Sequence, residues 1–192
     1  MSRKEYYGKG WSRFCLRCLK LSGWTVVGEP IPDPKAVVLG VPHTSMKDFV
    51  LSYLLMAGYG RVPHVMIKKE LFFWPLGPVL RALGCIPVDR SNATTLVKSL
   101  IDSMNASDDF LLAVAPEGTR KPVKHWKAGS LAIAARTGVP VYAGYIDYCK
   151  KHISFGEKFP LAGEPKEDMK RLQEYYETLH LTARHPEKYI TR

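Results

Sequence analysis

The chain has 192 residues, 46% of them hydrophobic, which is enough for one domain with a substantial core and gives no sign of a second. Its formal net charge is +10, and residues 1–24 hold six basic residues against a single acidic one, so nucleic acid and anionic lipid are both suitable partners. No stretch approaches the roughly 20 apolar residues of a membrane-spanning helix, and the N-terminus lacks the apolar core of a signal peptide. We therefore expect a cytoplasmic protein that at most rests on the inner face of the cell membrane.

Residues 9–22 have the spacing of a short amphipathic helix. Its apolar stripe consists of Trp11, Phe14, Cys15, Cys18 and Leu19. The basic side chains between them project away from this stripe. Such a helix either lies in the plane of the lipid headgroups or docks its apolar face on the domain, and both interpretations stay open. We divide the chain into residues 1–26, the basic helix and its lead-in, and residues 27–192, the main domain.

The four cysteines give no metal site. Cys15 and Cys18 form a C-x-x-C pair, a spacing found in metal and redox sites, but Cys85 and Cys149 are isolated and complete no zinc site. Because Cys15 and Cys18 share one face of the predicted helix, buried or lipid-facing thiols are the better interpretation.

The main domain alternates apolar strand-like runs with helix-like segments. Strands are predicted at residues 24–27, 36–41, 62–67, 84–90, 110–115, 140–146 and 152–155. Helices are predicted at residues 49–57, in a short segment ending at 83, and at 93–105, 128–137 and 165–183. The run at 110–115 is apolar throughout, as in a strand covered on both faces. The pattern predicts a single α/β domain with a mostly parallel central sheet flanked by helices.

Four large apolar residues, Leu71 to Trp74, follow two lysines and precede a proline. Core packing would explain this cluster, and so would a rim that contacts a membrane.

A histidine and an aspartate stand five positions apart between the strand at 36–41 and the helix that follows it. Asp48 falls in the first turn of this helix, where its carboxylate could orient His43 and leave one ring nitrogen free as a general base near neutral pH. A structural alternative is a capping box, because Ser45-x-x-Asp48 has its spacing.

Two further polar clusters also follow predicted strands, at Asp89–Arg90 and at Glu117–Arg120. Ligands of α/β sheets bind at the carboxyl ends of the strands, so we expect the clusters to meet the His43 loop there. The guanidinium groups of Arg90 and Arg120 suit a phosphate, which they can bind in a bidentate manner.

Four blocks between residues 37 and 148 resemble the glycerophospholipid acyltransferases of the lysophosphatidic acid acyltransferase type. HTSMKD at His43–Asp48 is similar to the family's H-x4-D block, and GCIPVDR at Gly84–Arg90 to its second block. PEGTR ending at Arg120 and VPVY ending at Tyr142 are similar to the third and fourth blocks. The chain is similar to a short bacterial branch of the family.

The resemblance implies an O-acyltransferase domain at 27–192. His43 would be the general base on the acceptor and Asp48 would orient it. The phosphate end of the acceptor would be held by Lys68, Arg90, Glu117, Gly118, Thr119 and Arg120. The acyl donor would be an acyl thioester, acyl-CoA or acyl-ACP, with no cofactor. The basic helix and the Leu71–Trp74 rim would contact the membrane surface, and nucleic acid is not an expected partner.

Some residues depart from the better-known members, which leaves the acceptor open. Pro42 precedes the histidine and Lys47 precedes the aspartate, where other residues are usual in the family. The expected acceptor is lysophospholipid-like, such as 1-acyl-glycerol 3-phosphate, and the alternative is a lyso-aminolipid or another monoacylated acceptor. Two interpretations of other kinds are a non-enzymatic binder of anionic lipid or nucleic acid, and a thioester hydrolase that uses the same site.

Overall fold

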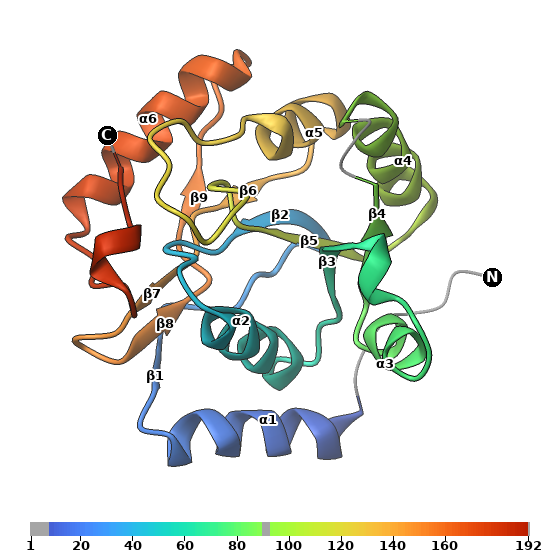
Figure 1. Ribbon diagram of the computed structural model, residues 1–192, viewed down its shortest axis with the longest axis vertical. Coiled ribbons are helices and arrows are strands. Elements are labelled where there is room, and N and C mark those ends of the chain that lie inside the picture. Colours follow the sequence, from blue (N-terminus) through green and yellow to red (C-terminus); the bar gives the residue numbers. More distant parts are fainter. Residues whose placement is uncertain (1–7, 90–92, 192) are drawn as a thin grey trace.

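A computed structural model describes residues 8–89 and 93–191 (Figure 1). Its centre is a six-stranded sheet in the order β4-β3-β5-β2-β6-β9. The strands are β2 (Lys35–Leu39), β3 (Pro63–Lys68), β4 (Cys85–Val88), β5 (Phe110–Val114), β6 (Val141–Tyr142) and β9 (Lys158–Phe159). All neighbouring pairs are parallel except β6 and β9. The prediction of an α/β fold with a mostly parallel central sheet is confirmed.

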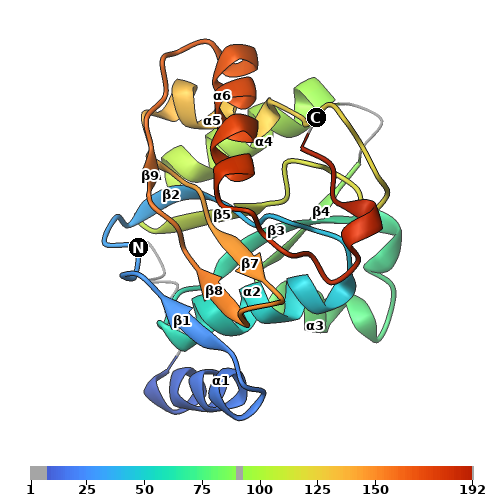
Figure 2. The same ribbon diagram turned by 90° about the vertical axis from the view of Figure 1, so that its left-hand side faces the viewer.

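Helices cover both faces of this sheet (Figures 1 and 2). On one face lies α2 (Met46–Gly58), with α1 (Lys9–Leu21) beyond it; on the other lie α4 (Ala93–Ala106), α5 (Gly129–Thr137) and α6 (Pro165–Thr178). The short helices η1 (Lys69–Leu71), α3 (Leu76–Ala82) and η2 (Pro186–Lys188) complete the set in the described residues.

The side chains of β2 alternate between two hydrophobic clusters, as the pleat of a strand requires. Ala36 and Val38 pack in the cluster that contains Leu55 of α2. Val37 and Leu39 pack in the larger cluster that α4, α5 and α6 cover. Because both faces are buried, the sheet can carry uninterrupted apolar runs such as the one at 110–115.

The single strand predicted at 140–146 is wrong: the chain forms two strands in different sheets there. After β6 it crosses into a second sheet of order β1-β8-β7, made of β1 (Thr25–Val27), β8 (His152–Ser154) and β7 (Tyr145–Asp147). Gly144 permits the crossing, because a Cβ at this position would lie 2.4 Å from the carbonyl oxygen of Leu39. A close backbone approach of this kind requires glycine.

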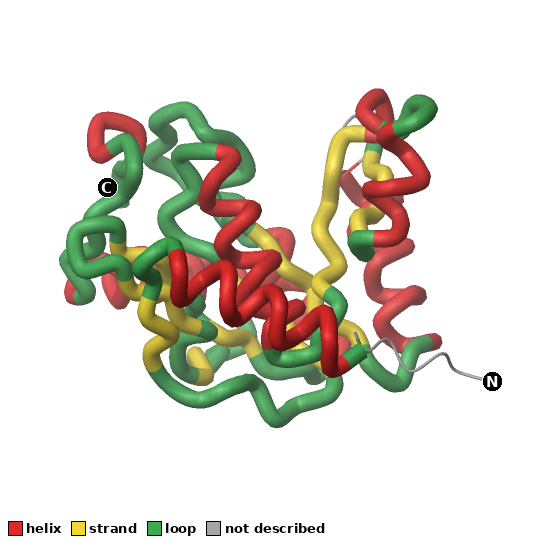
Figure 3. The backbone as a smooth tube through the Cα atoms, turned by 90° about the horizontal axis from the view of Figure 1, so that it is seen from below, coloured by secondary structure: helices red, strands yellow, loops and turns green. Residues whose placement is uncertain are grey.

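The N-terminal helix docks on the domain and also leaves apolar side chains in solvent. Figure 3 shows α1 crossing α2. Cys15 and Leu19 are buried at this contact, and a Cβ at Gly58 would lie 2.7 Å from Leu16 Cδ2, so glycine allows the close approach. Trp11 and Phe14 stay exposed and stack on each other at 5.3 Å. In the described part of the chain, no helix combines the length and apolar character needed to span a bilayer.

The final helix ends at Thr178, several residues before the predicted end at 183. His180 has a left-handed backbone conformation, φ 48°, which turns the chain out of the helix. Residues 179–191 then run back along the domain, where Thr182 accepts a hydrogen bond from the Tyr148 N–H at 2.8 Å. Leu179 and Leu181 pack against the larger core cluster along this path. Tertiary packing of these apolar side chains therefore replaces the helical continuation.

Candidate active site

The loop that carries His43 joins β2 to α2 at the carboxyl ends of the parallel strands, where an α/β sheet binds its ligands. It forms one wall of a pocket of about 810 Å³. The predicted site residues that line this pocket are His43, Asp48, Lys68, Gly118, Thr119 and Arg120. Much of the remaining wall is apolar and includes Leu55, Ile67, Leu71, Leu80, Leu100 and Ile133. Residues predicted from separate strand ends thus meet in one cavity.

Asp48, in the first turn of α2, accepts hydrogen bonds from the His43 loop and from Tyr148. It is 2% exposed, and its Oδ2 accepts hydrogen bonds from the N–H groups of Thr44 and Ser45, both at 2.7 Å. Its Oδ1 accepts from the hydroxyls of Ser45 at 2.8 Å and Tyr148 at 2.6 Å. The capping box weighed from the sequence is therefore present, and Asp48 fastens the loop to α2. Its orienting effect on the imidazole stays a prediction.

His43 is half-buried and is held through its backbone. Its N–H donates to Glu117 Oε1 at 2.8 Å, and the adjacent Thr44 Oγ1 accepts a hydrogen bond from the N–H of His185 at 3.3 Å. The loop is thus tied to the turn after β5 and to the C-terminal segment. Both contacts bridge long sequence separations and position the imidazole in the pocket wall.

Glu117 does not line the pocket but lies inside the domain. It is 7% exposed, and its Oε2 has no hydrogen-bond partner in the residues the structure describes. Burial raises the pKa of Glu117 to about 7, although the His43 N–H and its own backbone oppose the rise. A carboxyl group in this place supports the histidine loop and offers little to an anionic phosphate.

We expect the Glu117→Gln substitution to change how stability depends on pH. Because the pKa of Glu117 is higher in the folded chain, the folded protein keeps a proton that the unfolded chain has released between about pH 4.5 and 7. The contribution of Glu117 to the free energy of unfolding is full below pH 4.5 and falls as the pH rises to about 7, by up to about 3 kcal/mol. Glutamine does not titrate, so wild type should lose stability relative to the variant over this window.

Urea unfolding of the two proteins at several pH values between 4 and 8 measures this difference. Stability profiles that stay parallel over the whole range would contradict a raised pKa for Glu117.

The structure describes the surroundings of all the residues predicted to bind the phosphate except Arg90. Lys68 and Arg120 are exposed, and among the described residues neither forms an ion pair with a carboxylate. Thr119 Oγ1 accepts the N–H of Lys121 at 3.2 Å, within the turn that Gly118 makes with φ 65°. Arg90 lies outside the described residues.

Asp89, the neighbour of Arg90 in the sequence, pairs with Lys69 at 2.5 Å on the surface. The strand end at Val88 therefore places an exposed ion pair beside the pocket rather than a free carboxylate.

Sequence reasoning missed Tyr148, the residue directly after β7. Its hydroxyl donates a hydrogen bond to Asp48. The Tyr148 ring packs edge-on to Trp24 with centroids 5.0 Å apart, and the Lys47 ammonium lies 5.8 Å from the Tyr148 centroid. Burial and the hydrogen bond to Asp48 raise the pKa of Tyr148, so the phenol stays protonated as a donor. The contact joins residues 100 positions apart, so no local pattern in the sequence predicts it.

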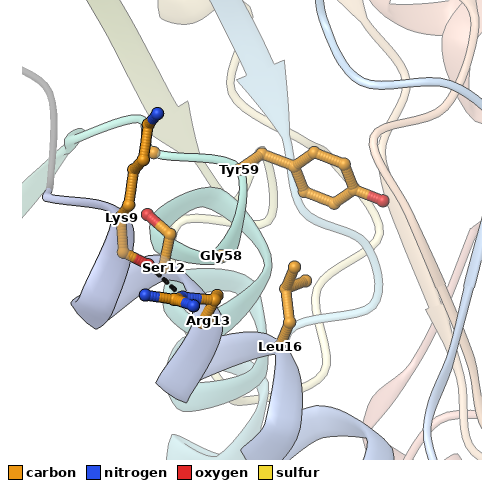
Figure 4. A pocket seen from close by; sticks show the side chains of 7 residues that line it. Lys9, Ser12, Arg13, Leu16, Gly58 and Tyr59 are labelled. Atoms are coloured by element: carbon orange, nitrogen blue, oxygen red, sulfur yellow. Dashed lines mark hydrogen bonds between the residues drawn. The ribbon is translucent and has the colours of Figure 1, made fainter.

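A smaller, more open hollow of about 520 Å³ lies between α1 and the end of α2 (Figure 4). Lys9, Ser12, Arg13, Leu16 and Tyr59 line it, and none of the predicted site residues does. In the described ranges, His, Cys, Asp and Glu form no group of three or more that could hold a metal ion.

A sequence model of the family described as Acyltransferase matches residues 23–147, about two thirds of the chain. The chain belongs to the acyltransferase family. The resemblance drawn from the four blocks is confirmed at this level, and the acyltransferase match contains His43, Asp48 and the turn at Glu117–Arg120. No curated protein sequence matches the chain.

Among solved structures, this acyltransferase is similar to the 1-acyl-sn-glycerophosphate (LPA) acyltransferase PlsC from Thermotoga maritima. The TM-score is 0.59 and the sequence identity 21%, over 91% of this chain and 80% of that chain. At this identity the similarity shows a shared fold.

Proposed function

We propose that this acyltransferase moves a fatty acyl chain from acyl-CoA or acyl-ACP to the hydroxyl of a lysophospholipid-like acceptor such as 1-acyl-glycerol 3-phosphate. The observation that carries the proposal is the pocket wall in which His43 stands. One part of that wall is apolar, as an acyl chain requires, and another carries Lys68 and Arg120, as a phosphate requires. Neither cation pairs with a carboxylate of the residues that the structure describes. The similar fold of an LPA acyltransferase agrees with it.

In the proposed reaction the His43 imidazole takes the proton from the acceptor hydroxyl while the hydroxyl oxygen attacks the thioester carbonyl. The tetrahedral intermediate then collapses to the ester, and the C–S bond breaks. The leaving thiolate receives the proton back from the imidazolium. A thioester is already activated, so a base and correct positioning of the two substrates are sufficient to accelerate this step.

The carboxylates of Asp48 and Glu117 are positioning groups in this proposal. Asp48 holds the loop against α2 through the Thr44 and Ser45 amides, and Glu117 holds the His43 backbone. Arg90, Arg120, Lys68, Gly118 and Thr119 are proposed to hold the phosphate end of the acceptor.

The test is release of free thiol from palmitoyl-CoA in the presence of vesicles and a panel of acceptors. The panel contains 1-acyl-glycerol 3-phosphate, glycerol 3-phosphate, other lysophospholipids and lyso-aminolipids, and palmitoyl-ACP serves as the second donor. Release that requires one acceptor supports acyl transfer and names the acceptor class. Release without any acceptor would identify a thioester hydrolase, and no release with either donor would favour the binding-protein interpretation.

We further propose that the protein works on the inner face of the cell membrane through two exposed apolar surfaces. One is the rim at the pocket mouth, where Leu71 is 45%, Phe73 58% and Trp74 84% exposed. The other is the Trp11–Phe14 stack on α1, beside the basic side chains of that helix. Phe72, the remaining residue of the predicted rim, is half-buried, and the Arg81 guanidinium lies 5.1 Å from the centroid of its ring. Aromatic side chains next to cations suit the headgroup region of anionic lipid.

We expect Trp74→Ala to weaken binding to vesicles of anionic phospholipid by about tenfold, because a large apolar surface no longer enters the lipid. Co-sedimentation with vesicles measures the partition coefficient. The unfolding temperature should stay unchanged, since Trp74 is almost fully in solvent. Phe72→Ala is the contrasting variant, which loses a packed ring and should lower stability more than lipid binding. Equal vesicle binding by wild type and Trp74→Ala would contradict the proposal that the rim enters the lipid.

A further inference from the structure

The first turn of α5 lines the same pocket as His43 and carries the buried hydroxyl of Ser130. Gly129 and Ser130, the first two residues of α5, both belong to the pocket wall. Ser130 is 5% exposed, and its Oγ has no hydrogen-bond partner in the described residues. A buried hydroxyl left unsatisfied in this way calls for a ligand or another polar group.

The N-terminus of α5 adds backbone N–H donors at this place. The first N–H groups of a helix have no acceptor within it, and Ala128, the capping residue, offers no side-chain hydrogen bond. There is no acidic residue in the first turn to neutralise the helix dipole. A Cβ built on Gly129 meets no atom within 4 Å, so the space in front of this turn is open. Helix ends of this kind attract anions.

Lys127 brings a positive charge to the same turn and was not predicted as a site residue. Its side chain lies across Gly118, where a Cβ would stand 3.0 Å from Cδ and 3.4 Å from Nζ of the lysine. Its backbone N–H donates to the carbonyl of Pro116 at 2.8 Å, which anchors the residue to the Glu117–Arg120 turn. Like Arg120, Lys127 makes no ion pair with a carboxylate in the described part of the chain. Both line the pocket.

Each feature alone has an ordinary explanation, since exposed lysines are common and a serine is tolerated in a first helical turn. Their coincidence in one pocket wall is the unusual observation. A lysine ammonium, a serine hydroxyl and the first N–H groups of a helix, with Arg120 in the same wall, provide both the charge and the directed donors that a phosphate dianion requires.

We propose that Lys127, Ser130 and the N-terminus of α5 form a phosphate-ester subsite of the acyl-transfer pocket. The inference rests on the proposed function for the origin of the phosphate, which is either the acceptor's phosphomonoester or a phosphate of the donor's carrier. In both cases the ammonium of Lys127 pairs with the anion, and the Ser130 hydroxyl and the first N–H groups of α5 donate to its oxygens.

Calorimetric titration with glycerol 3-phosphate and with free coenzyme A tests the subsite without any turnover. Lys127→Ala should lower the affinity for one of the two probes at least tenfold, Ser130→Ala about threefold, and Lys127→Arg much less than Lys127→Ala. Lys124→Ala is the matched control, because Lys124 is an exposed lysine of the same basic loop, residues 121–127, and lies outside the pocket wall. Far-UV circular dichroism and the unfolding temperature check that each variant keeps its fold.

The probe that loses affinity identifies the source of the phosphate. A loss for glycerol 3-phosphate, with a raised KM for the acceptor and an unchanged KM for the thioester, assigns the subsite to the acceptor. The converse pattern assigns it to the donor. If Lys127→Ala binds both probes as Lys124→Ala does, or if wild type binds neither, the subsite is wrong. If wild type binds a probe through Lys127 yet transfers no acyl chain, the subsite stands and the proposed reaction fails.

Discussion

We expect His43→Ala to lower kcat for acyl transfer by about 10²- to 10⁴-fold, the usual contribution of a general base. The imidazole is half-buried in the pocket wall, and no other histidine lines that wall among the described residues. The backbone N–H that binds Glu117 remains in the variant, so the free energy of unfolding should change by less than about 1 kcal/mol. The acceptor-dependent thiol release measures kcat, and urea unfolding measures stability.

His125→Ala is the matched control, because His125 is an exposed histidine of the basic loop outside the pocket. It should leave kcat unchanged. A His43→Ala protein that keeps most of its activity would rule out the base assignment, whatever the acceptor is. Loss of activity together with a large loss of stability would instead show that the ring is structural.

We expect Asp48→Ala to have the largest effect on stability at the site, lowering the free energy of unfolding by about 3–5 kcal/mol. The carboxylate accepts hydrogen bonds from two backbone amides and two hydroxyls inside the domain. Each hydrogen bond to a charged group contributes about 1.5–3 kcal/mol, and removal leaves buried donors without a partner. The contributions are not additive, so the total stays below their sum.

Two milder variants separate the two roles of Asp48, as the cap of α2 and as the group that positions His43. Asp48→Asn keeps the shape and one acceptor oxygen, so it should lose less stability than alanine. It should still lose some, because its amide donor faces existing donors. Tyr148→Phe removes only the hydroxyl donor and should cost about 1 kcal/mol. Its activity tests the positioning role: a lower kcat with an unchanged acceptor KM shows that the Tyr148–Asp48 contact aligns His43.

The outcomes distinguish the two interpretations of the motif. A destabilised Asp48→Asn protein that retains its kcat would show that Asp48 acts as a helix cap alone. A wild-type free energy of unfolding in Asp48→Ala would contradict the hydrogen-bond network itself.

Most elements of the fold were predictable because their signals are local. The apolar run at 110–115 became β5, and the periodic segment at 128–137 became α5, each within one residue of the prediction. The errors in the predicted elements lie where contacts with residues distant in the sequence decide the conformation of the backbone. The run at 140–146 is apolar throughout, and nothing in it reveals that Gly144 must pass against the backbone of β2. The two-residue strand β9 is too short to leave a pattern.

The site shows the same division between local and tertiary information. Local patterns were sufficient to predict the His43–Asp48 spacing, the capping box at Ser45, the strand-end position of the polar clusters and the family. Three contacts depend on how the elements pack: Glu117 turns inward to the His43 amide, Tyr148 reaches Asp48, and Lys127 lies over Gly118. The first two contacts join residues 74 and 100 positions apart. Periodicity encodes which face of an element is buried, but the partner of a buried polar group is decided by which elements pack together.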